Sequence, residues 1–169
     1  MLTHIEALEL VKPTSKFVHV MIVSDLMKKL AQQLSQNHVE WELVGLLHDL
    51  DYDEVQNNVA IHGRLAADKL RDQLPPHCLH AILVHDSRLG FKATSWLDKA
   101  LRAIDSFTII MEESGTGPNK LTPELFKITL DHISGKQPWH KQNLSLIEDL
   151  GMSFDAFLNF CIDSLKLRK

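Results

Sequence analysis

The sequence predicts an all-α protein, a compact single-domain helical bundle, on three observations. Apolar residues recur at the spacing of one face of an α-helix along almost the whole chain. No segment shows the alternation of apolar and polar residues that is typical of a half-buried strand. With 169 residues, 44% of them hydrophobic, the chain can bury about two-thirds of the surface that it exposes when unfolded, which is enough for one core.

The first half of the chain contains several expected helices. Residues 16–34 place apolar side chains on one face and lysine and glutamine on the other, as an amphipathic helix requires. The segment "WELVGLLHDL", which ends near Asp49, is apolar around most of its circumference, so we expect it inside the protein. A polar loop, "DYDEVQNN", follows, and a helix over roughly 61–72 comes after it. The prolines of "PPHCLHAILVHD" mark the start of the next helix.

The second half begins with a long helix, "SWLDKALRAIDSFTIIM", whose apolar residues form one stripe. Turn-forming residues dominate "ESGTGPNK", so residues 114–121 are the expected linker between a helical core, 1–113, and C-terminal helices in 122–169. Beyond this linker, "TPELFKITLDHI" begins with a good N-cap residue and a proline, and "SFDAFLNFCIDSLK" has the pattern of a final amphipathic helix.

The composition argues against several classes of protein. The net charge is -4 and no basic stripe alternates with aromatic residues, so nucleic acid is not the expected partner. Cys78 and Cys161 lie far apart, which suits a reducing compartment and argues against disulfides or a thiolate zinc site. The N-terminal residues lack the pattern of a signal peptide, and no apolar run is long enough to span a membrane. We therefore expect a cytoplasmic protein without a membrane partner.

The apolar segment that ends near residue 49 carries a histidine and an aspartate side by side. His48 and Asp49 stand where leucine would pack better. Aspartate is almost never fully buried without a partner, because moving a lone carboxylate out of water costs several kcal/mol or shifts its pKa. The doublet therefore indicates a polar feature inside the core.

Further polar residues fall on apolar helix faces, namely His19, His62, His85 and Asp105. Each one alone has an ordinary explanation, such as a hydrogen-bonded core histidine or, for Asp105, an ion pair with the nearby Arg102. Several imidazoles and two carboxylates on buried faces are explained together by a shared cation, which removes the desolvation cost for all of them. His140, by contrast, falls in a polar segment and is not expected at such a site.

The order and spacing of these residues resemble the HD superfamily of metal-dependent phosphohydrolases, an all-helical fold named for adjacent His and Asp ligands. The chain is most similar to a group of uncharacterised bacterial HDIG-type hydrolases. The resemblance lies in "LVGLLHDLDYD", "IHGRLAADKL", "HAILVHDSR" and "LDKALRAID", in that order, and in the later "LGMSFDAFL". It covers nearly the whole chain and implies one HD-type domain with its metal-binding core in 1–113.

The resemblance also implies a ligand set. His19, His48, Asp49 and Asp105 correspond to the ligands of a first metal ion, and Asp49 would bridge to a second ion held by His62 and His85. A single metal ion remains the alternative if those two histidines contact only substrate. The chain departs from the family pattern at Asp51, which replaces the glycine of HDIG, and at Asp86 after His85, and it lacks a lysine-rich stretch after the linker.

The ligand types suggest the chemistry. Imidazole and carboxylate without thiolate suit one or two divalent ions of Mn, Fe, Co, Ni or Zn. Such ions activate water and neutralise charge on a phosphoryl group. We therefore expect a metal-dependent phosphohydrolase that acts on a nucleotide or another small phosphate ester, with Asp49, Arg64 and Arg88 as catalytic residues. Lys99 is a third candidate for phosphate binding, whereas turn chemistry explains Asp51 as well as contact with a ligand through water does.

Two other functions fit the same residues. Superfamily members with this ligand pattern include mixed-valent di-iron oxygenases, which would require iron and O₂. A non-catalytic regulatory module, in which the metal is structural, is the third possibility, although intact ligands argue against it. The sequence leaves the substrate, the identity of the metal and the oligomeric state open.

Overall fold

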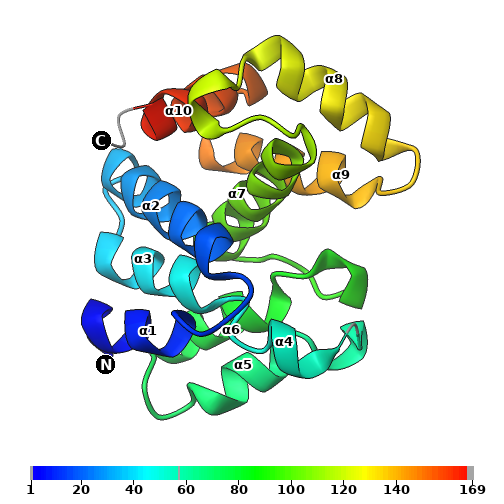
Figure 1. Ribbon diagram of the computed structural model, residues 1–169. Helices are drawn as coiled ribbons and strands as arrows, with labels where there is room; N and C mark the ends of the chain where they lie inside the picture. The colour runs from blue at the N-terminus through cyan, green and yellow to red at the C-terminus, as the bar shows by residue number, and fades with distance from the viewer. Residues whose placement is uncertain (1, 57, 167–169) are drawn as a thin grey trace.

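The computed structural model describes residues 2–56 and 58–166 (Figure 1). Within these residues the regular elements are all helical, so the predicted all-α class is confirmed. The α-helices are α1 (His4–Val11), α2 (Phe17–Gln33), α3 (His38–Leu47), α4 (Tyr52–Val55), α5 (Arg64–Lys69), α6 (Pro76–Val84), α7 (Trp96–Glu113), α8 (Pro123–Ser134), α9 (Trp139–Ser145) and α10 (Phe154–Lys166). Short 3₁₀ turns are η1 (Val59–Ile61), η2 (Ser87–Leu89), η3 (Pro118–Lys120) and η4 (Leu146–Leu150).

Helices α2 and α3 pack closely together, and a glycine makes this possible. A Cβ atom on Gly45 of α3 would lie 2.9 Å from the Cα atom of Ser24 on α2, closer than real contacts allow. The Ser24 hydroxyl also donates a hydrogen bond to the carbonyl oxygen of Glu42 (2.9 Å). This close approach brings the helix that carries His19 next to the helix that ends at His48.

Helix α7 runs through the middle of the protein and contacts both its halves (Figure 1). Its start is fixed by a capping box between Ser95 and Asp98. On its C-terminal half, the Phe107 ring stacks on Phe126 of α8, with centroids 5.0 Å apart, and meets Phe157 of α10 edge-on at 6.2 Å. One buried apolar cluster therefore extends through the predicted core and the C-terminal helices, across the 114–121 connection.

Several boundaries differ from the sequence-based expectation. Helix α1 was not expected; a capping box between Thr3 and Glu6 forms it, and it buries only Ala7 and Val11. The helix expected over 61–72 is shorter, because α5 begins at Arg64.

The predicted polar loop after the doublet contains the short helix α4. Residues 167–169 of the predicted C-terminal segment lie outside the described residues. None of the described helices is both long and apolar enough to cross a membrane.

Candidate metal centre

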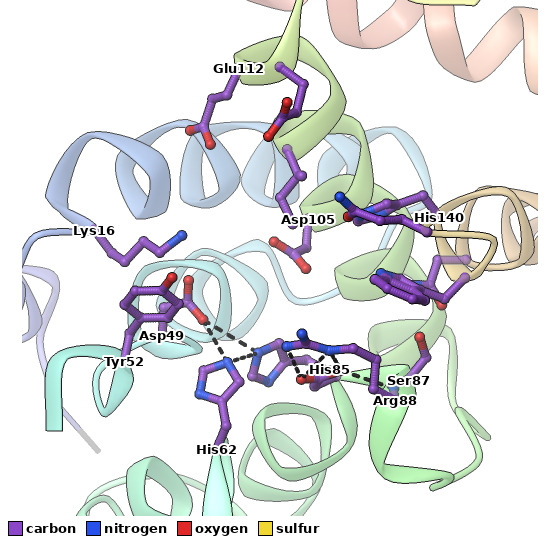
Figure 2. A pocket seen from close by; sticks show the side chains of 16 residues that line it. Lys16, Asp49, Tyr52, His62, His85, Ser87, Arg88, Asp105, Glu112 and His140 are labelled. Atoms are coloured by element: carbon purple, nitrogen blue, oxygen red, sulfur yellow. Dashed lines mark hydrogen bonds and ion pairs between the residues drawn. The ribbon is translucent and has the colours of Figure 1, made fainter. Parts of the chain in front are cut away.

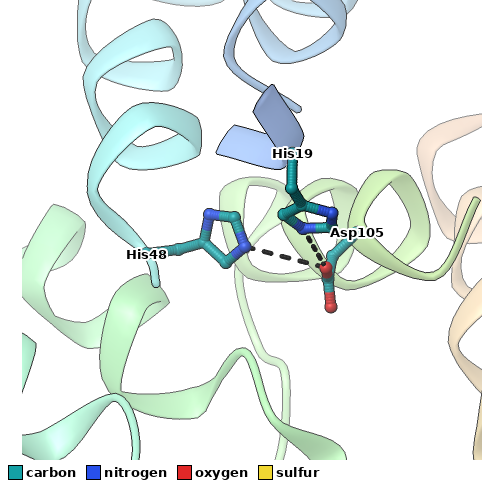
Figure 3. Close-up of side chains that lie close together, drawn as sticks. All are labelled: His19, His48 and Asp105. Atoms are coloured by element: carbon teal, nitrogen blue, oxygen red, sulfur yellow. Dashed lines mark hydrogen bonds and ion pairs between the residues drawn. The ribbon is translucent and has the colours of Figure 1, made fainter. Parts of the chain in front are cut away.

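Residues from five separate segments meet where these helices adjoin (Figures 2 and 3). His19 lies in the first turn of α2, and Asp105 lies in the middle of α7. His48 and His85 cap the C-terminal ends of α3 and α6. The remaining two are Asp49, which follows His48, and His62, which lies between η1 and α5. The structure thus brings together all of the ligands that the resemblance implied.

The first group consists of His19, His48 and Asp105. Figure 3 shows that both imidazoles point at the same carboxylate oxygen, Asp105 Oδ1, with Nε2 distances of 3.0 Å from His19 and 3.6 Å from His48. Asp49 Oδ2 lies 3.6 Å from His48 Nε2 and 3.9 Å from His19 Nε2. Two imidazole nitrogens and two carboxylate oxygens therefore surround one point.

The second group lies on the other side of the same Asp49 carboxylate. Asp49 Oδ1 is 3.2 Å from His62 Nε2 and 3.4 Å from His85 Nε2 (Figure 2). The two Nε2 atoms are 3.1 Å apart. The two oxygens of Asp49 thus face two different sets of imidazole nitrogens, which is the arrangement of a bridging carboxylate.

Each imidazole is oriented by a hydrogen bond on its other nitrogen. The Nδ1 atom of His48 bonds the carbonyl oxygen of Gly45 (2.9 Å), and that of His85 bonds the carbonyl oxygen of Ile82 (2.7 Å). Because a carbonyl oxygen can only accept, each Nδ1 carries a proton, and neutral rings present a lone pair at Nε2. Histidines that bind metals in proteins are held in the same way.

The other two histidines use carboxylates for the same purpose. His62 Nδ1 lies 2.8 Å from Asp51 Oδ1, and His19 Nδ1 lies 3.1 Å from Glu112 Oε1. Asp51 is completely buried and also accepts a hydrogen bond from the backbone N–H of Ala66 (3.1 Å). Asp51 therefore orients His62, a candidate metal ligand, and does not merely shape a turn, as one sequence-based interpretation had it.

A glycine permits His62 to reach the site. Gly63 has a positive φ of +73°, which glycine adopts readily, and it is the residue directly before α5. A Cβ atom there would lie 2.7 Å from the carbonyl oxygen of Ile82 and 3.2 Å from His85 Nδ1. Only glycine allows the two histidines to come this close.

The donor set fits a metal ion on two grounds. Within the described residues, His48 Nε2 is buried and has no hydrogen-bond partner, and a buried polar atom of this kind is costly. The facing Nε2 atoms of His62 and His85 cannot both present lone pairs at 3.1 Å unless a cation or a proton lies between them. Ligands that share an ion at about 2.1 Å lie about 3.0 to 3.5 Å from each other, close to the distances found here. The buried His/Asp cluster could therefore bind a metal.

The same contacts shift the pKa values of the site when no metal is bound. Burial alone would raise the pKa of Asp49 and Asp105, but the surrounding histidines outweigh burial and hold both well below the usual range. Burial alone would lower the pKa of His19, but Asp105 and Glu112 raise it to about 10. The pKa of His62 is likewise raised to about 10 against the effect of burial, by Asp49 and Asp51. Protons therefore occupy the site in the absence of metal.

A pocket of about 260 Å³ opens on this cluster (Figure 2). Asp49, His62, His85 and Asp105 line one side of it. The opposite wall comes from the segment around α9, with Gln137, Trp139, His140 and Asn143. Lys16 and Arg88 are the lysine and the arginine that line the pocket.

The expected phosphate-binding residues divide into two groups. Arg88 lines the pocket, where it forms a bidentate ion pair with Asp86 (Nε–Oδ1 2.9 Å, Nη2–Oδ2 2.6 Å). Arg64 is the first, exposed residue of α5 and does not line this pocket; its contact with substrate stays a prediction. Lys99 points elsewhere as well and pairs with Asp149 (2.8 Å).

The surroundings of three further residues were missed or misassigned from the sequence. Lys16 was not considered, although it precedes His19 by one helical turn. His140 was assigned to polar surroundings, whereas it is 3% exposed and lines the pocket. Arg102 does not pair with Asp105; its guanidinium donates to the carbonyl oxygens of Val84 (2.8 Å) and Phe91 (2.7 Å). The Asp105 carboxylate is thereby left for the histidines.

No family model matches this chain, and neither a curated protein nor a solved structure matches it significantly. The assignment of the site therefore rests on its own geometry.

Proposed function

We propose that this protein is a metal-dependent phosphohydrolase that acts on a nucleotide or another small phosphate ester. The observation that carries the proposal is the Asp49 carboxylate, whose two oxygens face separate sets of imidazole nitrogens. Sites that hold two metal ions through one bridging carboxylate are common in enzymes that hydrolyse phosphate esters. The resemblance of the sequence blocks to the HD superfamily supports the same assignment.

The residues divide naturally between two divalent ions. His19, His48, Asp49 and Asp105 would hold one, and His62, His85 and Asp49 the other. Without thiolates, this set suits Mn, Fe, Co, Ni or Zn. Such ions, when bound, lower the pKa of a water molecule and offset the negative charge of a phosphoryl group.

The protein supplies further positive charge at the pocket mouth. Arg88 uses Nε and Nη2 for Asp86, which fixes the guanidinium plane and leaves Nη1 for an anion. Lys16 Nζ lies over the Tyr52 ring, 4.1 Å from its centroid. These two cations come from opposite sides of the metal cluster (Figure 2). Their role in the proposed reaction is to bind and orient the phosphate.

Asp53 holds the segment that carries Lys16. The backbone N–H of Ser15 donates to Asp53 Oδ2 (2.8 Å), and the Ser15 hydroxyl donates to the other oxygen. This contact joins the start of α2 to α4 and keeps Lys16 next to Tyr52.

Metal content and turnover test the proposal directly. Protein purified without chelator should contain transition metal by elemental analysis and release inorganic phosphate from at least one member of a phosphoester panel. Protein that contains no metal, takes up none of the candidate ions and hydrolyses no phosphoester would refute the proposal.

Chelation should destabilise the wild-type protein. An ion that binds only the folded state contributes about 3 kcal/mol at a hundredfold excess over its Kd, which corresponds to roughly 6 to 12 °C in Tm for a chain of this size. Asp105→Ala removes the oxygen that both His19 and His48 approach, so its Tm should hardly respond to chelator. Thermal denaturation with and without chelator measures the difference. Equal responses of the two proteins would show that Asp105 is not a ligand.

Arg88→Ala should lower kcat/KM without changing metal content. A cation that stabilises charge on the reacting phosphate is worth roughly 2 to 4 kcal/mol in kcat/KM. Arg64→Ala is the matched control, because Arg64 lies outside the pocket, and it should keep wild-type activity. Steady-state kinetics with elemental analysis measures both variants. If Arg64→Ala shows the larger loss, the phosphate does not bind where the structure places Arg88.

A di-iron oxygenase is the second candidate, because four imidazoles around a bridging carboxylate also suit iron. Consumption of O₂ by the iron-loaded protein, without release of phosphate under any metal, would select it.

A further inference from the structure

The pocket wall opposite the metal cluster is built by the C-terminal part of the chain. Gln137 precedes α9, and His140 and Asn143 lie on it three residues apart, hence on the same face. We call these three residues the α9 wall. None of them belongs to the candidate metal ligands, and all three line the pocket.

A chain of hydrogen bonds fixes the α9 wall to α7. The Asn143 amide, Nδ2, donates to Ser106 Oγ (3.0 Å), and Ser106 Oγ bonds His140 Nδ1 (3.1 Å). His140 Nε2 then bonds Gln137 Oε1 (2.9 Å). Ser106 directly follows Asp105 in α7, so the wall is anchored one residue from the metal cluster.

The hydrogen-bond pattern determines what the wall offers a ligand. Gln137 Oε1 can only accept, so His140 carries its proton on Nε2 and accepts from Ser106 at Nδ1. Burial lowers the pKa of His140, which keeps the ring neutral. Both ring nitrogens are thus used within the wall. Among the bonds found in the described residues, Asn143 Oδ1 and Gln137 Nε2 have no partner. The wall therefore presents one acceptor and one donor, and no charge.

Asn143 and Ser106 are buried, unlike polar side chains on the general protein surface. Asn143 is 5% exposed and Ser106 is fully buried. Burying an amide costs free energy unless its hydrogen-bonding capacity is used. An amide that is fixed on one side and lines a pocket on the other is therefore suited to a polar group of a ligand.

The size and charge of the pocket narrow the class of ligand. Its volume of about 260 Å³ falls below the range of about 300–1,000 Å³ that is usual for drug-sized ligands. A hydroxyl group both donates and accepts, so it matches an acceptor next to a donor. Lys16 and Arg88 come from opposite sides of the metal cluster, and Arg88 lies beside the wall, 5.8 Å from the centroid of the Trp139 ring (Figure 2). Both line the pocket and provide places for phosphate.

We propose that the substrate is a small phosphate monoester whose alcohol part bears further hydroxyl groups, and that Asn143 and Gln137 recognise those hydroxyls. This inference rests on the proposed phosphohydrolase function and specifies its substrate class as polyol or small sugar phosphates. His140 and Ser106 are positioning residues, which hold the two amides in place.

The test compares two pairs of probes that differ only in hydroxyl groups, together with one nucleotide. Binding to the manganese-loaded full chain is measured by calorimetry with 3,4-dihydroxybutylphosphonate and butylphosphonate, which a phosphohydrolase does not cleave. Phosphate release is measured separately with glycerol 3-phosphate, propyl phosphate and adenosine 5′-monophosphate. Wild-type protein should bind the dihydroxylated phosphonate about tenfold more tightly than butylphosphonate. It should also show the highest kcat/KM for glycerol 3-phosphate.

Variants show whether the wall causes this preference. Asn143→Ala should reduce the tenfold ratio to less than about threefold, with butylphosphonate affinity and metal content unchanged. Gln137→Ala should act in the same direction, and it serves as the second variant because Gln137 is only half-buried. Gln142→Ala is the matched control: it lies on the same helix, is exposed and does not line the pocket. A buried amide that is merely structural would change Tm and leave the ratio intact.

The outcomes separate the two proposals. Three results would overturn the substrate assignment and leave the phosphohydrolase proposal standing. The first is equal binding of both phosphonates by wild-type protein, and the second is a tenfold binding ratio that persists in both amide variants. The third is faster hydrolysis of adenosine 5′-monophosphate than of glycerol 3-phosphate. The opposite result is also possible: the protein binds the dihydroxylated phosphonate more tightly but releases no phosphate from any probe. That result would overturn the proposed phosphohydrolase function and leave the recognition of hydroxyl groups by the α9 wall standing.

Discussion

Asp49→Asn should abolish metal binding and phosphate release together. The substitution keeps the shape of the side chain but removes the negative charge that faces both sets of histidines, at 3.2 and 3.4 Å on one oxygen and 3.6 and 3.9 Å on the other. We expect a fall in kcat/KM on the order of a thousandfold or more, which is about 4 kcal/mol at 1.4 kcal/mol per factor of ten. The substitution thus acts on both sets of histidines at once.

Elemental analysis and phosphate release on the same preparation measure this effect. Asp68→Asn is the matched control, since Asp68 is an exposed carboxylate of α5 that pairs with Arg71. It should retain full metal content and activity. Normal metal occupancy and turnover in Asp49→Asn would mean that the His-Asp doublet is structural, and the enzyme proposal would fail.

Metal affinity should rise steeply with pH. The pKa of His19 and that of His62 are about 10 without metal, so both rings are doubly protonated at neutral pH and must lose a proton to bind an ion. Uptake of two ions should release about two protons. The apparent affinity for the two metal ions together should therefore increase by up to about a hundredfold per pH unit below pH 10.

Calorimetry in buffers with different ionisation enthalpies counts the released protons. Glu112→Gln weakens the contact that helps to raise the pKa of His19, so this variant should release fewer protons at pH 8 to 9 while keeping its metal ligands. Affinity that does not change between pH 7 and 9, with no proton release, would contradict the assignment of these histidines.

The stability of the metal-free protein should follow the opposite trend. The folded pKa of His19 and His62 is raised above 6.5, so their contribution is fully present below pH 6.5 and is lost as the pH rises through about 10. The folded pKa of Asp49 and Asp105 is lowered below 3.8, so their contribution is present above pH 3.8 and is lost on further acidification. Metal-free protein should thus be most stable between about pH 4 and 6.5.

The sequence determined the helical class and the set of residues at the cluster. Helical periodicity is a local property, so the long helices α2 and α7 could be predicted from their apolar spacing. His48 and Asp49 stood out for the same reason, because a polar doublet in an apolar segment conflicts with the pattern around it. Helix α1 escaped prediction because it spans only 8 residues and buries only two side chains.

The direction of each side chain and its partners were decided only by the tertiary structure. Asp51 and Ala66 are 15 residues apart, and His140 and Ser106 are 34 residues apart; contacts over such distances leave no periodic signal in the sequence. Arg64 looked suitable because it follows His62 closely, yet it begins α5 as an exposed residue outside the pocket lining. Local patterns report which residues a helix would bury, whereas packing between distant helices fixes which of them share a site.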